Sequence, residues 1–304
     1  MYRNTATLAL LCSSLTVTGS MLAGSALAQG PAPLPELVLE EVVVTATKVA
    51  ESIQDIPSTI TAVGGEALDE FQIRDFSDVT SLAPGLSLDS INPTNPTVAL
   101  LGVSFDPQSN ARASVETYWN EMPIATQAIF QQMFDLARIE VLRGPQGTLQ
   151  GRTSPAGAIL VNTRLPSFDE IEATIQQTVS DNDGYNTQVG LGIPISDSLA
   201  VRIAGVHDSN ELEGIEHVKT GTDQSGHTNA GRISVVWEPT DTFSATLISE
   251  YLESYKDGFE DVVNITGGSP QTFDREAIHD GLSPIEQRNK LNVLRMRLDL
   301  PGHE

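Results

Sequence analysis

The segment "RNKLNVLRMRLDL" (Arg288–Leu300) alternates from residue to residue over its second half. Apolar and charged side chains take turns there: Leu294, Met296, Leu298 and Leu300 against Arg295, Arg297 and Asp299. Because successive side chains of a β-strand point to opposite faces, this spacing predicts a strand with one apolar and one charged face. Such a strand suits the boundary between lipid and a watery lumen, although a strand of a soluble sandwich also alternates.

Five earlier segments alternate in the same way: Ile171–Ser180, Asn186–Ile195, Leu199–Asp208, Gly231–Trp237 and Phe243–Tyr251. The lengths of their connections distinguish a membrane barrel from a soluble sandwich. Pro194–Ser198 and Glu238–Thr242 are tight turns, whereas Ser209–Thr228 and Lys256–Gln287 are long. Short turns at one end and long loops at the other are typical of an outer-membrane β-barrel. The short connection "DNDG" (Asp181–Gly184) on the long-loop side is the exception.

Residues 53–166 mix helix and strand signals. Arg74–Leu86 predicts a helix, because Phe76, Val79 and Leu82 share one face and Pro84-Gly85 ends it. Strands are predicted over these segments, the last holding two of them around a glycine-rich turn: Pro96–Val103, Ala113–Trp119 and Phe134–Pro166. This block reads as one small α/β domain.

Residues 1–28 predict a signal peptide that is cleaved after export. Arg3 precedes an apolar stretch, and Ala26-Leu27-Ala28 gives the small-x-small cleavage pattern. An uncleaved membrane anchor is the weaker alternative, because Ser and Thr interrupt the apolar run. The only cysteine, Cys12, lies in this segment, so the mature chain is expected to contain no disulfide, thiolate metal site or thiol nucleophile.

Composition and motifs argue against several functions. With 17 Lys+Arg against 40 Asp+Glu, the net charge of -23 disfavours a nucleic-acid partner. His207, His217 and His227 recur at a constant interval that fits neither a helix face nor a strand face, so solvated loop residues are expected rather than a metal site. No Gly-x-Ser-x-Gly motif or phosphate-binding loop appears. No enzyme activity, catalytic residue, metal or cofactor is therefore predicted.

Three segments together resemble TonB-dependent outer-membrane receptors. "RIEVLRGPQGTLQGRTSPAGAILVNTR" (Arg138–Arg164) resembles the end of that family's plug domain, and Asp55–Leu88 resembles its beginning. "EEVVVTAT" (Glu40–Thr47) resembles the TonB box. The resemblance implies a mixed fold, with a small α/β plug followed by antiparallel transmembrane strands of a barrel of about 22 strands, of which about six are present.

The implied domains are a signal peptide (1–28), a flexible segment (29–52) with the TonB box at 40–47, a plug (53–166) and an N-terminal portion of the barrel (167–304). Six strands cannot close around a plug, so we expect the chain to be the N-terminal part of a longer receptor.

The resemblance also implies partners. In the family the TonB box adds as an edge strand to periplasmic TonB, and no hairpin partner for this segment is predicted nearby. The candidate TonB-binding residues are Glu41, Val42, Val43, Val44, Thr45 and Ala46. The other expected partners are outer-membrane lipid, the barrel-assembly machinery and a small ligand such as a ferric siderophore.

Two further residue sets follow from the resemblance. The candidate contacts between plug and barrel are Glu140, Arg143, Gly144, Gly147, Gly151 and Arg152. Arg143 and Arg152 are expected to meet Glu172 and Glu250 of the barrel wall, or alternatively to pair within the plug. The candidate ligand contacts, on the plug apices, are Asn92, Asn95, Phe105, Gln108, Tyr118, Trp119 and Gln127.

The chain departs from the family pattern at two places. Leu101 stands where members usually carry an arginine, and Asn120-Glu121 replaces the usual Asp-Gly. Because Glu tolerates a left-handed backbone poorly, we expect no tight primed turn at Glu121.

The resulting hypothesis is a TonB-dependent transporter, most often for a ferric siderophore, with carbohydrate or cobalamin as variants. The alternative is a non-transporting fragment: a plug-only TonB binder or a gene relic.

Overall fold

The computed structural model describes residues 43–44, 51–52, 59–89, 97–104, 113–125, 128, 132–146, 152–180, 184–212, 216–217, 221–257, 276–277 and 284–299. The chain divides into Met1–Glu40 and Glu41–Glu304, and all described residues belong to the second unit. The predicted signal peptide lies outside the described residues. No described helix is long and apolar enough to cross a membrane.

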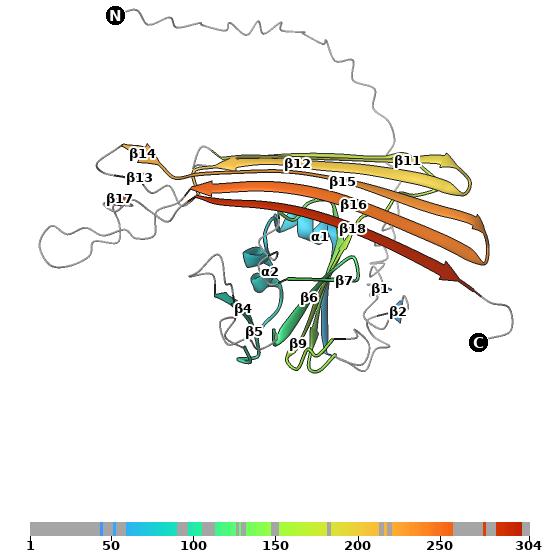
Figure 1. The fold of residues 1–304 in the computed structure, drawn as a ribbon, viewed down its shortest axis with the longest axis horizontal. Coiled ribbons are helices and arrows are strands. Elements are labelled where there is room, and N and C mark those ends of the chain that lie inside the picture. The colour runs from blue at the N-terminus through green and yellow to red at the C-terminus, as the bar shows by residue number, and fades with distance from the viewer. Residues whose placement is uncertain are drawn as a thin grey trace, which may run out of the picture. The chain divides into compact units, whose positions relative to one another are not determined.

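The C-terminal part forms one six-stranded antiparallel sheet, with its strands in chain order (Figure 1). The strands are β10 (Glu172–Val179), β11 (Tyr185–Ser196), β12 (Leu199–Asn210), β15 (Ser225–Thr240), β16 (Phe243–Asp257) and β18 (Ile285–Leu298). All six predicted strands are confirmed. All of them except β10 run further toward the long-loop end than predicted; β15, for example, already begins at Ser225.

The long connections carry three two-residue strands of their own. They are β13 (Glu216–His217), β14 (Thr222–Asp223) and β17 (Glu276–Ala277). β13 pairs with both of the others, so the two long connections meet in one small sheet.

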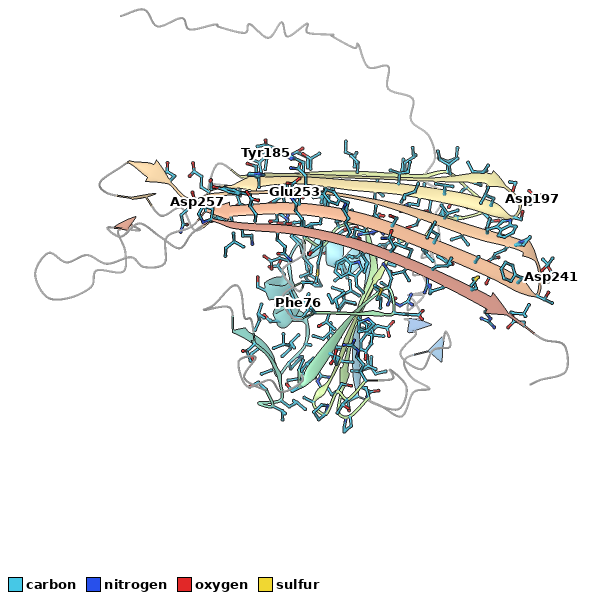
Figure 2. The ribbon with its side chains drawn as sticks, viewed as in Figure 1. Phe76, Tyr185, Asp197, Asp241, Glu253 and Asp257 are labelled. Atoms are coloured by element: carbon cyan, nitrogen blue, oxygen red, sulfur yellow. The ribbon has the colours of Figure 1, made fainter. Side chains whose placement is uncertain are left out.

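The two faces of the six-stranded sheet differ, as the alternation predicts. One face, called here the outward face, exposes apolar side chains that include Ile175 (81 % exposed), Ile203, Leu247 and Met296. The opposite, inner face buries Ala200, Arg202, Arg232 and Glu250 among others. Figure 2 shows Asp197 and Asp241 at the short-turn end of this sheet and Asp257 at the other end.

Residues 60–163 form the predicted α/β domain around a five-stranded sheet. Its strands, in spatial order, are β3 (Ile60–Gly64), β8 (Leu136–Arg143), β9 (Gly157–Thr163), β6 (Val115–Trp119) and β7 (Met122–Ile124). β6 and β9 are parallel, and the other neighbours are antiparallel. β4 (Leu86–Asp89) and β5 (Thr97–Leu100) form a separate hairpin.

Two short helices cover this domain. The predicted helix is confirmed as α2 (Phe76–Leu82), and the Asp75 side chain caps it through the backbone N–H groups of Ser77 and Asp78. α1 (Gly65–Glu70) was not predicted, because its six residues show too little periodicity to be recognised.

One apolar core joins the α/β domain to the sheet. Phe76, Val79 and Trp119 belong to it, and so do Ile248 and Leu291 on the inner faces of β16 and β18. The domain therefore packs directly on the inner face.

The expectation for Glu121 is wrong. Asn120 (φ 49°) and Glu121 (φ 68°) both have left-handed backbone, and Trp119 pairs with Met122, so β6 and β7 are joined by a two-residue primed turn. Tertiary contacts hold it: Asn120 Oδ1 accepts hydrogen bonds from the backbone N–H and hydroxyl of Thr163, and Arg295 binds the Glu121 carboxylate at 2.7 Å.

The predicted TonB box is not an unpaired strand. Its described residues form β1 (Val43–Val44), which pairs antiparallel with β2 (Glu51–Ser52). The two strands are separated by a short connection. They pair through backbone hydrogen bonds, which leave no pattern of side chains in the sequence from which the pairing could be predicted.

Candidate functional site: the interface between the α/β domain and the sheet

Asp135, which directly precedes β8, is clamped by an arginine of the six-stranded sheet. Arg202 on β12 donates from Nε to Asp135 Oδ2 at 2.8 Å and from Nη2 to Oδ1 at 2.5 Å. Both side chains are buried, at 2 % and 4 % exposure. Asp135 has a left-handed φ of 51°, which a short polar side chain tolerates better than most. The pair is a bidentate, charge-assisted contact between the two parts of the fold.

A second buried arginine, Arg232 on β15, holds the backbone of the same loop. Its Nη1 and Nη2 donate to the carbonyl oxygens of Asp135 (3.2 Å) and Phe134 (3.0 Å). Its guanidinium lies 4.2 Å from the centre of the Phe134 ring. Its Nε donates to Glu250 on β16 at 2.7 Å. Arg232 thus binds the backbone carbonyl groups of the Phe134–Asp135 loop, whereas Arg202 binds the Asp135 carboxylate.

The cluster balances two guanidinium groups with three carboxylates. Glu172 on β10 accepts from Arg202 Nη1 at 3.1 Å and remains 40 % exposed. Gly190 on β11 leaves space for the Arg202 guanidinium group. A Cβ at this position would lie 2.8 Å from Arg202 Nη2 and 2.6 Å from Thr174 Oγ1. Burying these charges is tolerated because each is paired, and removing one partner leaves an uncompensated charge at a loss of about 3–5 kcal/mol.

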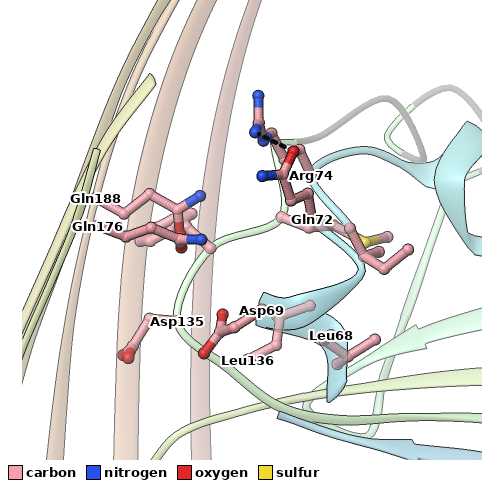
Figure 3. Close-up of a pocket in the computed structure, with 11 residues that line it drawn as sticks. Leu68, Asp69, Gln72, Arg74, Asp135, Leu136, Gln176 and Gln188 are labelled. Atoms are coloured by element: carbon pink, nitrogen blue, oxygen red, sulfur yellow. Dashed lines mark hydrogen bonds between the residues drawn. The ribbon is translucent and has the colours of Figure 1, made fainter. Parts of the chain in front are cut away.

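A small, partly open pocket of about 10 Å³ adjoins this cluster (Figure 3). Asp69 and Asp135 line it from the α/β domain, and Gln176 and Gln188 line it from β10 and β11. The volume suits one water molecule, and these side chains supply the polar partners that a buried water needs.

A larger polar cleft of about 550 Å³ opens between the turn from α1 to α2 and the long-loop ends of β12, β15 and β16. Its charged lining residues are Arg74, Asp75, Asp78, Asp208 and Lys256. The volume falls within the range of small-molecule sites, and the mixture of charges makes the cleft polar without favouring one sign strongly.

The family model of the TonB-dependent receptor plug domain matches residues 52–158, which cover the α/β domain up to the start of β9. The chain contains a plug domain of the TonB-dependent receptor type. Its α/β domain is the plug, and the six-stranded sheet after it is called the wall below.

Curated relatives agree with this assignment. The pesticin receptor of Yersinia pestis is 28% identical over 254 residues, which cover 77% of this chain and 36% of the relative. The iron-regulated outer membrane virulence protein of Vibrio cholerae is 27% identical, over 67% of this chain and 32% of the relative. The chain therefore spans about a third of the length of these relatives.

Solved structures share the fold. The ferric yersiniabactin uptake receptor FyuA from Yersinia pestis matches 79% of this chain and 38% of its own with a TM-score of 0.65 and 23% identity. The siderophore receptor PiuA from Acinetobacter baumannii matches 86% of this chain and 36% of its own with a TM-score of 0.69 and 14% identity.

The predicted contacts of Arg143 and Arg152 with the wall are not found among the described residues. Arg143 Nη2 donates to the Pro84 carbonyl at 3.3 Å, and Arg152 lies 3.7 Å from Glu116, so both pair within the plug. The expected acids are already bound by arginines of the wall itself. Arg232 faces Glu250 directly across the strand register, and Arg202 binds Glu172.

The other predicted contact residues also lie inside the plug or outside the described residues. Glu140 is fully buried and accepts from Arg138 Nε at 2.6 Å. Gly144, with a φ of 87°, forms the left-handed turn after β8. Gly147 and Gly151 lie outside the described residues.

Tyr118 and Trp119 are not available as ligand contacts. Each is 1% exposed, because β6 is an interior strand of the plug sheet. Burial, and secondarily the nearby Glu116 carboxylate, raises the pKa of Tyr118 above its usual value. The other predicted ligand residues lie outside the described residues: Asn92, Asn95, Phe105, Gln108 and Gln127. The same holds for Glu41, Val42, Thr45 and Ala46 of the TonB box.

Asp135, Arg202 and Arg232 were not among the residues predicted from the sequence. The alternation did place the two arginines on the face opposite Ile203 and Ile233, where an unpaired charge is expensive and a partner is expected. Asp135 gives no such signal, because it lies in a connection. Among the described residues, no three His, Cys, Asp or Glu side chains are grouped to hold a metal.

Proposed function

We propose that this protein is an outer-membrane receptor that takes up a scarce ligand, a ferric siderophore, with energy supplied through TonB. The observation that carries this proposal is the two-faced wall. It exposes apolar side chains outward, while its inner face holds a plug through the Arg202–Asp135 pair. A plug bound by discrete ionic contacts is held firmly, and those contacts can be broken when it is pulled.

The outward face supports a membrane location. On β16 the outward positions from Phe243 to Tyr251, apolar except for Ser249, span about 26 Å at roughly 3.3 Å per residue, close to the height of an outer-membrane apolar band. Trp237 and Phe243 make an edge-to-face contact at the short-turn end, as aromatic girdles do. Near the long loops, charged side chains replace them: Arg288 binds Glu253 at 2.9 Å. The same face implies contact with lipid and with the barrel-assembly machinery.

The ligand assignment draws on the relatives. Several carry iron or siderophore uptake in their names, including FyuA and PiuA. The polar cleft at the long-loop ends offers a site of suitable volume on the side from which a ligand arrives. No feature of the described residues favours carbohydrate or cobalamin.

TonB would bind by strand addition at β1. Within the described residues β1 pairs with β2 alone, so one edge of β1 is open and the other is reachable by displacing β2. Ligand and TonB would then be coupled through the plug, and each would strengthen the binding of the other. The cleaved signal peptide (1–28), the flexible segment (29–52), the plug (53–166) and the wall from residue 167 remain parts of this proposal.

The proposal is tested by uptake of ⁵⁵Fe-loaded siderophores, one of each chelate class, in iron-limited cells that lack their own receptors. We expect one class to be accumulated, and accumulation to be lost in cells without TonB. Val43→Pro, which removes a backbone donor of β1, should abolish accumulation and leave binding at 4 °C unchanged. Val63→Ala, inside the plug, is the control that should retain uptake. A receptor present in outer membranes that accumulates no class would favour the non-transporting alternative.

A further inference from the structure

Two glycines lie side by side in the apolar outward face of the wall. The strand register aligns one row across five strands: Val189, Gly205, Gly231, Tyr251 and Lys290. The row on its short-turn side contains the exposed Ile203 and Ile233. The glycines therefore leave a gap beside this apolar row.

Neither backbone conformation nor packing requires glycine at these two positions. Neither residue has a left-handed φ. Among the described atoms, a Cβ on Gly205 would meet the Ala230 carbonyl oxygen at 3.5 Å and Val189 Cγ2 at 3.7 Å, and one on Gly231 only the Ala204 carbonyl oxygen at 3.9 Å. Those are ordinary contacts, unlike the 2.8 Å approach to Arg202 at Gly190. Glycine weakens a strand interior, and where nothing internal explains it, it commonly marks close approach of a ligand.

The gap is a hollow of about 370 Å³ with an apolar body and one polar rim. Val189 and Tyr251 form its side walls, and the two glycines form its floor. On the long-loop side, His207 Nδ1 lies 2.6 Å from Asn229 Oδ1, and His207 Nε2 lies 3.2 Å from the Tyr185 hydroxyl. We call this hollow the glycine notch.

A cation stands beside the notch. The Lys290 ammonium lies 5.6 Å from the centre of the Tyr251 ring, on the neighbouring strand of the same row. The notch therefore runs from apolar, toward the middle of the strands, to the polar His207–Asn229 pair, toward the long loops, and Lys290 flanks it within the glycine row. This order matches a bilayer lipid, whose chains point to the membrane centre and whose headgroup lies at the interface.

We propose that the glycine notch binds one acyl chain of an anionic membrane lipid, with the headgroup at Lys290 and the His207–Asn229 pair. The proposal rests on the proposed function, because it requires the outward face to meet lipid. The notch is continuous with that apolar face, which favours a lipid chain over a polar partner. A second copy of the receptor or a partner helix would give other outcomes in the test below.

The test uses the receptor isolated from outer membranes, stripped of lipid in detergent and titrated with phosphatidylglycerol under native mass spectrometry. We expect one phosphatidylglycerol per chain to bind with saturation. The double variant Gly205→Val/Gly231→Val should bind at least tenfold more weakly, since two branched side chains fill the notch. Ala245→Val, on the outward face but outside the notch, is the matched control and should bind as the unsubstituted receptor does.

The headgroup part is tested separately. Phosphatidylcholine of identical chains should bind several-fold more weakly than phosphatidylglycerol, and Lys290→Gln should remove that preference. Equal binding by the double valine variant would overturn the notch as the site, and so would a notch-dependent dimer without lipid. If the receptor fractionates with outer membranes but shows these results, only this inference fails. If it does not reach the outer membrane at all, the proposed function fails with it.

Discussion

Asp135 is the residue on which the contact between plug and wall converges. Arg202 binds its carboxylate and Arg232 binds its carbonyl oxygen, both in a buried setting. Nothing in its local sequence marks it, because a lone Asp between strands is ordinary turn chemistry. Its importance arises only when the fold brings β12 and β15 beside it.

Asp135→Asn is expected to destabilise the plug by about 3 kcal/mol, because Arg202 loses its main counter-charge while Asn still tolerates the left-handed backbone. The chain has two tryptophans, Trp119 in the plug and Trp237 on the wall. A Trp237→Phe background therefore makes Trp119 fluorescence a reporter of plug unfolding in urea. Glu172→Gln is the control: its carboxylate is 40% exposed, so the loss should stay below about 1 kcal/mol. Equal losses for both variants would contradict the assignment.

Glu121→Gly is expected to stabilise the plug by about 1 kcal/mol. Glycine relieves the left-handed backbone at φ 68°, a gain of about 1–2 kcal/mol, and the lost contact with Arg295 is partly exposed and contributes about 0–1 kcal/mol. Glu121→Gln separates the two effects, since it keeps the strain and removes the charge. The same urea unfolding measures both variants, and a loss of stability in Glu121→Gly would mean that the ion pair dominates.

Tyr118 gives a pH dependence. Its raised pKa means that the unfolded chain loses the phenolic proton first, above the usual value of 10.0. Stability is therefore unaffected below about pH 10 and falls as the pH rises further. The free energy of unfolding, measured in urea between pH 9 and 11.5, should fall with rising pH, and it should fall less steeply in Tyr118→Phe. Identical curves for the two proteins would contradict a buried phenol.

At the scale of elements, the alternation of the six long wall strands was readable from the sequence, because one face exposes apolar side chains while the other packs against the plug. The small elements were not. α1 is shorter than two helical turns, and the turn at Asn120-Glu121 adopts a backbone that its second residue disfavours. Contacts with Thr163 and Arg295, distant in sequence, decide that turn, and local propensity cannot reveal them.

Depth in the membrane predicts the effect of charge on β16. Leu247→Arg lies within the apolar band and is expected to reduce the free energy of folding into lipid vesicles by about 2–4 kcal/mol. Tyr251→Arg, near the charged Glu253–Arg288 pair, should lose about 1 kcal/mol or less. Equal effects at the two positions would argue that this face does not meet lipid.

At the scale of the whole molecule, the sequence indicated which family the chain resembles, because its plug motifs are local strings of residues. It did not indicate how the plug is held. The predicted contact ran from plug arginines to wall acids, and the structure instead has two wall arginines, Arg202 and Arg232, beside the plug acid Asp135. Charge type alone cannot decide between these pairings, since both place opposite charges across one interface.

The central claim is that β1 pairs with a strand of TonB through its backbone. Disulfide cross-linking between the two proteins in living cells tests this claim most directly. Residues 29–304 contain no cysteine, so Val43→Cys or Val44→Cys introduces the one cysteine of this part of the protein. Each variant is produced together with TonB that carries a cysteine in the edge strand of its periplasmic domain. Each should form a disulfide-linked complex, and the amount of complex should increase when the transported siderophore is added. Ser52→Pro, which removes a donor opposite Val43, should increase it further. A receptor present at normal level in outer membranes that forms no covalent complex at either position would contradict the account.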